Sequence, residues 1–377
     1  MKYKLLLIVE AIGGGVRRHI VDLIRGLSHQ QFDITLLYGT SRADETFQEL
    51  LFTLQEKAEI IPCDSLVREI NPKQDMRALS EIKTVIRQIH PDIVHCHSSK
   101  AGILGRLAAK QMKVPKVFYT PHAYSFQAPE FAGCKKQVFT FLERWFSKHA
   151  TTLTFNVSGG EKQAALGAKL DRPEKFKVIY NGIPDIPLLS KETARAALGL
   201  PFDVPVVGVI ARLNEQKDPF TFCKIAKKVL SVHPDVQFAY IGDGPLQDAV
   251  QQWIRRQNIQ QQVHLLGYRK DAEMLVSGFD GYLLTSLYEG MPYSLVEAIR
   301  AGVSVAATRT VGNDEVVQPG ENGLLFPVGD AEQGAKSVLQ LLDNPFPTEQ
   351  VQASYRRRYT IEGMLSQIES YYQRGDT

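Results

Sequence analysis

The sequence predicts an α/β fold in which two doubly wound, Rossmann-like domains face a central cleft. Short runs rich in β-branched residues alternate with segments of helical periodicity along the whole chain, a pattern typical of parallel sheets covered by helices. At 377 residues the chain also exceeds one typical core. It suits two domains of about 150 to 200 residues each.

The first half of the chain contains six predicted strands, with helices between them, for example at 75–89 and 99–111. Ser158 and Glu161 have the spacing of a capping box, which predicts that a helix starts directly after the fifth strand. The strands are predicted at 3–9, 32–38, 92–96, 116–120, 152–157 and 176–180.

A break follows at "NGIPDIPLLSKE", residues 181–192, where two prolines and a change in charge sign indicate a linker. We therefore predict an N-terminal domain at 1–185 and a C-terminal domain at 186–357. The amphipathic stretch at 358–377 is predicted to form a helix that crosses back to the first domain. The strands of the second domain are predicted at 204–210, 236–241, 262–266, 279–284 and 303–306.

The composition, 44% apolar and 23% charged, is that of a soluble globular protein. The four cysteines form no regular framework, which predicts reduced thiols and neither a disulfide nor a structural zinc. The opening "MKYKLLLIVEAIGGG" suits a buried strand better than a signal peptide, and no run approaches the roughly 18 apolar residues that span a bilayer. We expect a protein that is not integral to a membrane.

The net charge of +3 is unevenly divided: residues 1–185 carry 26 Lys/Arg and 19 Asp/Glu, and the rest carry 18 and 22. Segment 100–148 holds nine basic residues and only two acids, Glu130 and Glu143. This segment is either a solvated helix face or a surface attracted to anionic lipids or a phosphorylated acceptor. No nucleic-acid-reading motif accompanies it. The aromatic residues interleaved there are Tyr119, Tyr124, Phe126, Phe131, Phe139, Phe141, Trp145 and Phe146.

Two loops have the residues of a phosphate site. In "EAIGGGVRRHI" three glycines precede a helix and let backbone amides approach a phosphate, although the same turn serves packing equally often. In "GVIARLNEQKDP" Arg212 and Lys217 follow a buried strand, and the two cations suit a diphosphate. Solvated loop charges are the alternative for that pair.

The stretch "SLYEGMPYSLVEAIRAG" places Glu289 in a loop and Glu297 on a helix at about 292–301, with Pro292 in the first turn and Gly302 after the end. Helical rise predicts that these carboxylates lie well beyond the roughly 5 Å of a retaining glycosidase pair. Glu297 suits a ribose diol, although a helix-start acid is the alternative for either glutamate. The backbone amides predicted to face an anion are those of Tyr293, Ser294 and Leu295.

Taken together, these motifs resemble the family 4 retaining glycosyltransferases of the GT-B fold. The resemblance covers essentially the whole chain in the right order. It is carried by "GGG", "VHCHSSKAG", "YTPHAYSF", "NGI", "ARLNEQKD", "IGDGPL", "LLGYRKD", the Glu-x7-Glu spacing and "NGLLFPVGD". The sequence departs from the family at "NGIPD", where an acid commonly follows NGI, so Asn181 is interpreted as structural.

The resemblance implies a role for each candidate residue. Catalytic roles fall on His122, which faces the sugar, on the diphosphate-binding Arg212 and Lys217, and on Glu289, which contacts the donor sugar. Donor-binding roles fall on Gly14 and Gly15 in the loop over the phosphates, on Tyr268 and Arg269 beside the base, on Tyr293, Ser294 and Leu295, and on the ribose-binding Glu297.

No metal or other cofactor is expected. His95 and His97 have a spacing that suits metal ligands, but without a third ligand they are interpreted as strand-end packing. The chain contains no Asp-x-Asp, the motif that usually holds a metal against a nucleotide-sugar diphosphate. Arg212, Lys217 and a helix end can neutralise that charge instead.

The function predicted is that of a metal-independent, retaining hexosyl- or N-acetylhexosaminyltransferase. Its donor is predicted to be a UDP- or GDP-linked sugar, and its acceptor is predicted to be a hydroxyl of a lipid-linked saccharide, as in bacterial capsule or exopolysaccharide synthesis. The enzyme is expected in the cytoplasm, peripheral at the inner face of the cell membrane and in contact with anionic lipid. The alternatives are a sugar-nucleotide epimerase and a non-catalytic partner subunit of a glycosyltransferase.

Overall fold

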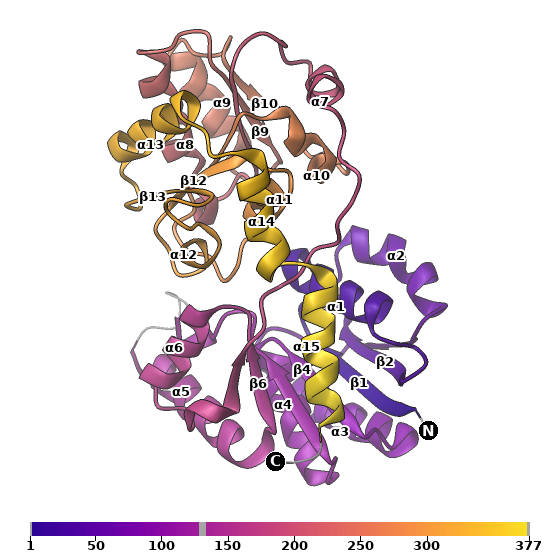
Figure 1. Ribbon diagram of the computed structural model, residues 1–377. Coiled ribbons are helices and arrows are strands. Elements are labelled where there is room, and N and C mark those ends of the chain that lie inside the picture. The colour runs from indigo at the N-terminus through magenta and orange to yellow at the C-terminus, as the bar shows by residue number, and fades with distance from the viewer. Residues whose placement is uncertain (1, 128–132, 375–377) are drawn as a thin grey trace. The chain divides into compact units, whose positions relative to one another are not determined.

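The computed structural model describes residues 2–127 and 133–374, which form two compact units (Figure 1). Unit 1 comprises residues 1–181 together with 361–377, and unit 2 comprises residues 182–360. Each unit has one parallel sheet with helices on both faces, so the two-domain, doubly wound α/β prediction is confirmed. Glu130 and Phe131 of the basic segment lie outside the described residues.

The sheet of unit 1 has the order β3-β2-β1-β4-β5-β6-β7, and every neighbouring pair is parallel. The strands are β1 (Tyr3–Val9), β2 (Phe32–Gly39), β3 (Glu59–Cys63), β4 (Ile93–His97), β5 (Lys116–Thr120), β6 (Leu153–Asn156) and β7 (Phe176–Val178). The helices are α1 (Gly14–Gly26), α2 (Glu45–Gln55), α3 (Pro72–Ile89), α4 (Ser99–Gln111), α5 (Cys134–Ala150), α6 (Gly159–Gly167) and α15 (Ile361–Gln373).

Alternate residues of the central strand β1 serve two cores, one on each face of the sheet. Leu5 and Leu7 pack into the core beneath α1 and α15, whereas Leu6 and Ile8 pack into the core beneath α3 and α4. This two-sided burial explains why β1 is a continuous apolar run rather than an alternating one.

The C-terminal helix α15 belongs to unit 1 and lies beside α1 (Figure 1). The carboxylate of Glu369 accepts a hydrogen bond from the backbone N–H of Ser28 at 2.7 Å, and the Tyr372 hydroxyl lies 2.6 Å from Nδ1 of His95. Tyr372 is fully buried, so the last helix completes the core on this face of the sheet.

Unit 2 has the strand order β10-β9-β8-β11-β12-β13. Its strands are β8 (Val206–Ile210), β9 (Gln237–Ile241), β10 (Val263–Leu265), β11 (Gly281–Leu284), β12 (Ser304–Thr308) and β13 (Gly323–Phe326). Its helices are α7 (Lys191–Leu198), α8 (Pro219–Leu230), α9 (Gln247–Arg256), α10 (Ala272–Leu275), α11 (Tyr293–Arg300), α12 (Asn313–Val316), α13 (Ala331–Asp343) and α14 (Thr348–Arg358).

Segment 100–148 does not form one exposed surface, because four of its aromatic side chains are buried. Their rings form core contacts because the segment contains the whole of β5 and parts of α4 and α5, which pack on the sheet of unit 1. Arg106 is also fully buried, and Lys100 forms an ion pair with Asp75 at 2.6 Å. The buried aromatic residues are Tyr119, Tyr124, Phe126 and Phe146, whereas Phe141 is 62% exposed.

No helix within residues 2–127 and 133–374 combines the length and the apolar character needed to cross a bilayer. Cys63, Cys96 and Cys223 are free, buried thiols. Burial raises the pKa of the Cys63 thiol to about 11, so this group is protonated at neutral pH.

Candidate active site

The site residues of unit 2 gather at the point where its strand order reverses. β8 and β11 are parallel neighbours in the sheet although β9 and β10 lie between them in the sequence. Arg212 and Lys217 follow the carboxyl end of β8, and Glu289 follows that of β11. Ligands of doubly wound sheets bind in the crevice at such a switch point.

Two glycines of "IGDGPL" hold the Arg212 loop in place. A Cβ on Gly242 would lie 2.0 Å from the carbonyl oxygen of Ala211, and one on Gly244 would lie 2.4 Å from that of Leu213. The backbone N–H of Leu213 donates to the carbonyl of Asp243 at 2.7 Å. Only glycine permits this close backbone approach, and the motif therefore positions the loop that carries Arg212.

Lys217 and Glu289 form an ion pair in which Nζ donates to Oε1. The Ser286 hydroxyl donates to the same oxygen at 2.6 Å, and the Glu289 side chain is only 7% exposed. The sequence assigned these two residues to different parts of a donor, whereas the structure joins them. Among the described residues the guanidinium of Arg212 pairs with no carboxylate, and Arg212 is exposed.

Helix α11 begins at Tyr293, so Tyr293, Ser294 and Leu295 form its first turn and Pro292 occupies the N-cap position instead of the first turn. Pro292 supplies no side-chain cap, and the first turn contains no acid, so no residue of this turn offsets the positive end of the helix dipole. Gly302 follows the helix with φ of +77°, a left-handed conformation that suits glycine.

Glu297 lies on α11, is 6% exposed, and is near the buried Tyr282 hydroxyl. Burial raises the pKa of Tyr282, and the neighbouring carboxylates of Glu297 and Glu289 raise it further. The same hydroxyl accepts a hydrogen bond from the backbone N–H of Ile210 at 2.9 Å. Tyr282 thus links the end of β8 to the region of both glutamates.

Tyr268 and Arg269 do not join this cluster through their side chains. The Arg269 guanidinium forms two hydrogen bonds to Asp271, each 2.8 Å long, and a third to the carbonyl of Ala197 at 3.2 Å. Tyr268 is 58% exposed. The donor-binding roles of Tyr268 and Arg269 stay predictions from the sequence.

In unit 1 a carboxylate occupies the glycine turn. α1 starts at Gly14, whose φ is +55°, and Gly15 is its second residue. The backbone N–H of Gly14 donates to Asp44 at 3.3 Å, and Arg17 forms an ion pair with the same carboxylate. Although partial burial raises the pKa of Asp44, the hydrogen bonds from Arg17 and from backbone amides give a net decrease. Asp44 therefore stands as an anion at the start of α1.

His122 belongs to a cluster of imidazoles in unit 1. Its Nε2 lies 3.2 Å from Nδ1 of His97, and its ring packs edge-on against that of His19 at 4.9 Å between centroids. Nδ1 of His19 lies 3.1 Å from the side-chain oxygen of Asn181. One nitrogen from each of the three histidines lies within 4.8 Å of the others, a group that can hold a transition metal.

The premise that His97 lacks a third possible ligand is wrong, because His19 and His122 lie beside it. His97 is also fully buried and packs against the ring of His95, so its interpretation as packing is not contradicted. His95 does pack: its Nε2 lies 2.8 Å from the Thr120 hydroxyl, and its ring is fully buried. The sequence contained the signal for this cluster, since His97 and His122 lie at or just after the carboxyl ends of strands that turn out to be neighbours.

Glu161 holds the loop that contains His122. Its carboxylate accepts hydrogen bonds from the backbone N–H groups of Ala123 at 2.6 Å and Val157 at 3.0 Å. His122 and Ala123 have positive φ values of 53° and 99°, a backbone conformation that residues other than glycine rarely adopt. The capping-box spacing predicts the bond from Glu161 N–H to Ser158, which is present at 3.1 Å, but not the bond between the Glu161 carboxylate and Ala123.

The buried imidazoles predict acid sensitivity. Burial lowers the pKa of His19 to about 4, and it lowers those of His97 and His122 well below the ordinary value of 6.5. The unfolded chain takes up these protons near pH 6.5, so the stability present above that pH is lost as the pH falls toward 4. For His19 alone the shift corresponds to roughly 3 kcal/mol. We expect the melting temperature to fall between pH 6.5 and 4.5.

His19→Gln should flatten this pH dependence, whereas His233→Gln, at an exposed position of unit 2, should preserve it. Glu161 acts in the opposite direction, because burial raises the pKa of its carboxyl to about 7. The stability that this group contributes is fully present below pH 4.5 and is lost as the pH rises through 7. Equal slopes of melting temperature against pH in wild type and His19→Gln would contradict the prediction.

The protein thus has two doubly wound α/β domains, and the second has charged loops at its switch point. Many proteins of this class bind nucleotides there. Family models match both halves of the chain: Glycosyltransferase Family 4 over residues 13–185 and Glycosyl transferases group 1 over residues 190–359. The chain belongs to glycosyltransferase family 4 and has the GT-B fold. It is a glycosyltransferase.

One relative is the UDP-Gal:alpha-D-GlcNAc-diphosphoundecaprenol alpha-1,3-galactosyltransferase of Escherichia coli, 30% identical over 88% of this chain and 85% of that protein. The putative glycosyltransferase EpsD of Bacillus subtilis is 26% identical over 72% of this chain and 73% of its own length. Anabaena Alr3699/HepE, solved with UDP and glucose, has a TM-score of 0.80 at 22% identity, covering 98% of this chain and 99% of that one.

Proposed function

We propose that this glycosyltransferase transfers a hexose or N-acetylhexosamine from a UDP- or GDP-linked donor to a hydroxyl of a lipid-linked saccharide, as in capsule or exopolysaccharide synthesis. The observation that carries the donor part is the cluster at the switch point of unit 2, where Arg212 and the Lys217–Glu289 pair lie on neighbouring loops. The relatives favour UDP: one is named for UDP-Gal and a diphosphoundecaprenol-linked acceptor, and the HepE structure contains UDP.

Each group of the cluster suits one part of such a donor. Arg212, exposed and without a carboxylate partner among the described residues, suits the diphosphate, together with the uncapped start of α11. The buried carboxylate of Glu297 suits the two ribose hydroxyls. Glu289 suits a sugar hydroxyl, and its bond to Lys217 fixes the orientation of both side chains before the donor arrives.

The proposed transfer proceeds with retention and without a metal ion. The new bond forms on the face that the leaving diphosphate vacates, and a diphosphate oxygen accepts the proton of the acceptor hydroxyl. Arg212 and Lys217 supply the positive charge that a divalent cation would otherwise provide to the leaving group. The sequence supports this scheme because it contains no Asp-x-Asp. For unit 1, the donor-binding roles of His122 and of the Gly14–Gly15 turn stay predictions from the sequence.

A thermal-shift panel tests the donor site. UDP, GDP, ADP and their common sugar conjugates are added to the protein in EDTA, and we expect one nucleotide class to raise the melting temperature. Glu297→Ala should reduce that increase, because each charge-assisted hydrogen bond contributes about 1.5 to 3 kcal/mol. Glu362→Ala, at an exposed position of α15, is the control. If no nucleotide stabilises the wild type, the donor site is wrong; if stabilisation requires Mg²⁺, metal independence is wrong.

For the membrane we propose contact through the first half of α5, at the inner face of the cell membrane. Val138 is 57% exposed and Phe141 is 62% exposed, and Lys135 and Lys136 are exposed beside them. Apolar side chains next to cations suit the boundary of an anionic bilayer.

The membrane contact predicts that vesicles of phosphatidylglycerol co-sediment the protein at low salt and that vesicles of phosphatidylcholine do not. Changing Val138 and Phe141 to Ser should remove most of that binding. The matched control changes Val232 and Phe52, which are 58% and 75% exposed elsewhere, to Ser. Equal sedimentation of the two variants would exclude this face of α5.

A further inference from the structure

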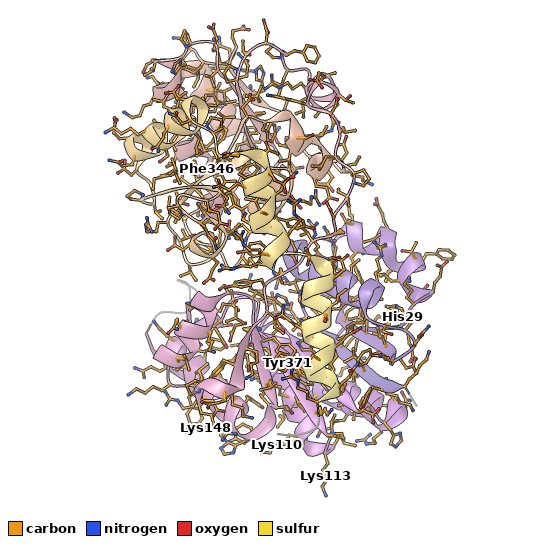
Figure 2. The ribbon with its side chains drawn as sticks, in the orientation of Figure 1. His29, Lys110, Lys113, Lys148, Phe346 and Tyr371 are labelled. Atoms are coloured by element: carbon orange, nitrogen blue, oxygen red, sulfur yellow. The ribbon has the colours of Figure 1, made fainter. Side chains whose placement is uncertain are left out.

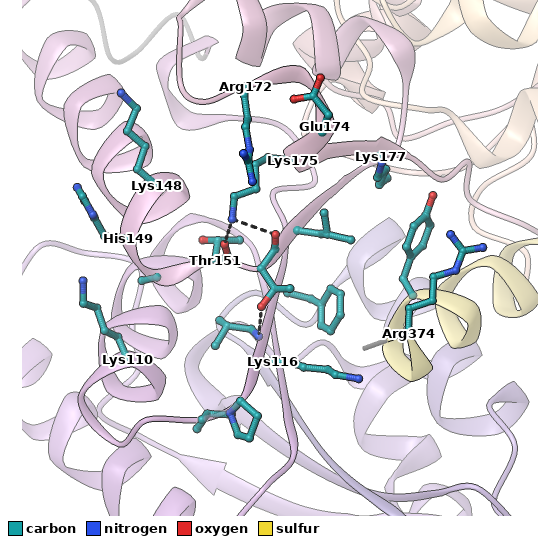
Figure 3. Close-up of a pocket in the computed structure, with 18 of the residues that line it drawn as sticks. Lys110, Lys116, Lys148, His149, Thr151, Arg172, Glu174, Lys175, Lys177 and Arg374 are labelled. Atoms are coloured by element: carbon teal, nitrogen blue, oxygen red, sulfur yellow. Dashed lines mark hydrogen bonds between the residues drawn. The ribbon is translucent and has the colours of Figure 1, made fainter. Parts of the chain in front are cut away.

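A basic pocket of about 690 Å³ lies at the amino-terminal ends of strands in the sheet of unit 1 (Figure 3). It is bordered by the carboxyl ends of α4 and α5, by segment 172–177 and by the last turn of α15. β5 begins at Lys116 inside this pocket, whereas His122 follows the other end of the same strand. Because each strand residue advances the chain by about 3.3 Å, the pocket and His122 lie at opposite ends of β5.

The charged side chains that line this pocket are almost all basic. Glu174 is its one acidic residue, and Figure 2 shows Lys110, Lys113 and Lys148 at the same end of unit 1. Four separate segments of the chain contribute the charges, so they are brought together by folding and not by a single basic run. The basic residues are Lys110, Lys113, Lys116, Lys148, Arg172, Lys175, Lys177 and Arg374.

Two of these cations have a structural role. Lys175 Nζ donates to the carbonyl of Thr151 at the end of α5, and Lys116 Nζ donates to the carbonyl of Tyr372 at 2.8 Å. Both bonds satisfy carbonyls at the ends of helices, where cations are favoured. They explain why some basic residues are needed around this pocket, but not why so many gather there.

The remaining cations lack negative partners. Within residues 2–127 and 133–374, Lys148, Arg172 and Lys177 form no ion pair with a carboxylate. Lys110 Nζ instead lies 4.7 Å from the centre of the Trp145 ring, and the Arg374 guanidinium lies 5.4 Å from that of Tyr371. Like charges gathered in one concavity repel one another, and a bound anion would remove that repulsion.

We propose that this pocket is a binding site for a phosphate-bearing anion, separate from the donor site. Its volume is within the roughly 300 to 1,000 Å³ typical of small-ligand sites. Arg172 and Arg374 offer planar forks for phosphate oxygens, and the lysines add point charges. The phosphate can belong to a membrane-lipid headgroup or to a soluble polyphosphate. The proposal does not rest on the transfer reaction.

Trp145 provides a local reporter, since Lys110 covers its ring and the only other tryptophan, Trp253, lies in unit 2. In a Trp253→Phe background, pyrophosphate is titrated in EDTA at constant ionic strength while tryptophan emission is recorded. We expect a saturable change. Exchanging Lys148, Arg172 and Lys177 together for Gln should weaken it at least tenfold, whereas Arg212→Ala should leave it unchanged.

The matched control exchanges Lys57, Lys73 and Arg87, which are exposed elsewhere on unit 1, for Gln and removes the same total charge. If the pocket variant and this control titrate alike, or if emission changes without saturation, the site does not exist. All variants carry exposed or half-exposed substitutions, and circular dichroism verifies their folding.

Vesicles distinguish the two sources of phosphate. The same emission change is followed with phosphatidylglycerol vesicles, with and without Val138→Ser and Phe141→Ser, which separate this pocket from the proposed membrane face of α5. Saturable binding of vesicles but not of pyrophosphate, lost only in the pocket variant, assigns the site to a lipid headgroup. Binding of pyrophosphate alone assigns it to a soluble ligand. Binding of neither would overturn the proposal.

Discussion

Replacing Arg212 by alanine is expected to lower turnover by about 10²- to 10³-fold, the usual effect of removing one donor that stabilises developing negative charge. The reason is its place at the switch point: Arg212 is exposed after β8 and pairs with no carboxylate among the described residues. The measurement is the rate of nucleoside diphosphate release with the donor that the thermal-shift panel selects.

Folding should be unaffected by this change, because an exposed side chain without a partner contributes within about 0.5 kcal/mol to stability. Lys217→Ala would be a poorer test, since it leaves the Glu289 carboxylate, only 7% exposed, without its cation. Arg255→Ala on the exposed side of α9 is the matched control. Normal turnover in Arg212→Ala would exclude its role at the leaving group, and a fall in melting temperature would show that the loss of rate is structural.

Most strands could be predicted from the sequence because buried parallel strands are continuous β-branched runs. Two strands were missed. β3 lies at the edge of its sheet, contains Pro62 and begins with the exposed Glu59, so it lacks the apolar signal of a central strand. β13 is also an edge strand, and Gly320, Gly323 and Pro327 around it indicate a loop rather than a strand.

The site was predictable where its residues are close in sequence. Pro292 and Gly302 bracket α11 to within one residue, and this placed Glu289 in a loop and Glu297 on the helix. The carboxylate of Asp44 at the Gly14 turn was not predictable, because 30 residues separate them. The bond from Lys217 to Glu289 spans 72 positions. Such contacts depend on strand order, which local patterns do not specify.

The largest loss of stability is expected from breaking the buried pair of Arg106 and Glu143. Nη2 of Arg106 donates to Glu143 at 2.8 Å, and these side chains are 0% and 4% exposed. The guanidinium also lies 3.9 Å from the centre of the Tyr119 ring, and Nε donates to the carbonyl of Gly102 at 2.6 Å. Although burial disfavours its charge, the Glu143 carboxylate keeps the pKa of Arg106 above its usual value. The pair therefore joins α4, α5 and β5.

Arg106→Met should lower the free energy of unfolding by about 3 to 5 kcal/mol, since it leaves a carboxylate buried without its cation. Adding Glu143→Gln should recover much of the loss, because the neutral amide has no charge to compensate and still accepts the hydrogen bond that the Tyr119 hydroxyl gives Glu143 at 3.0 Å. Urea denaturation of the two single variants and the double variant measures the coupling. Losses that simply add would show that the two charges do not depend on one another.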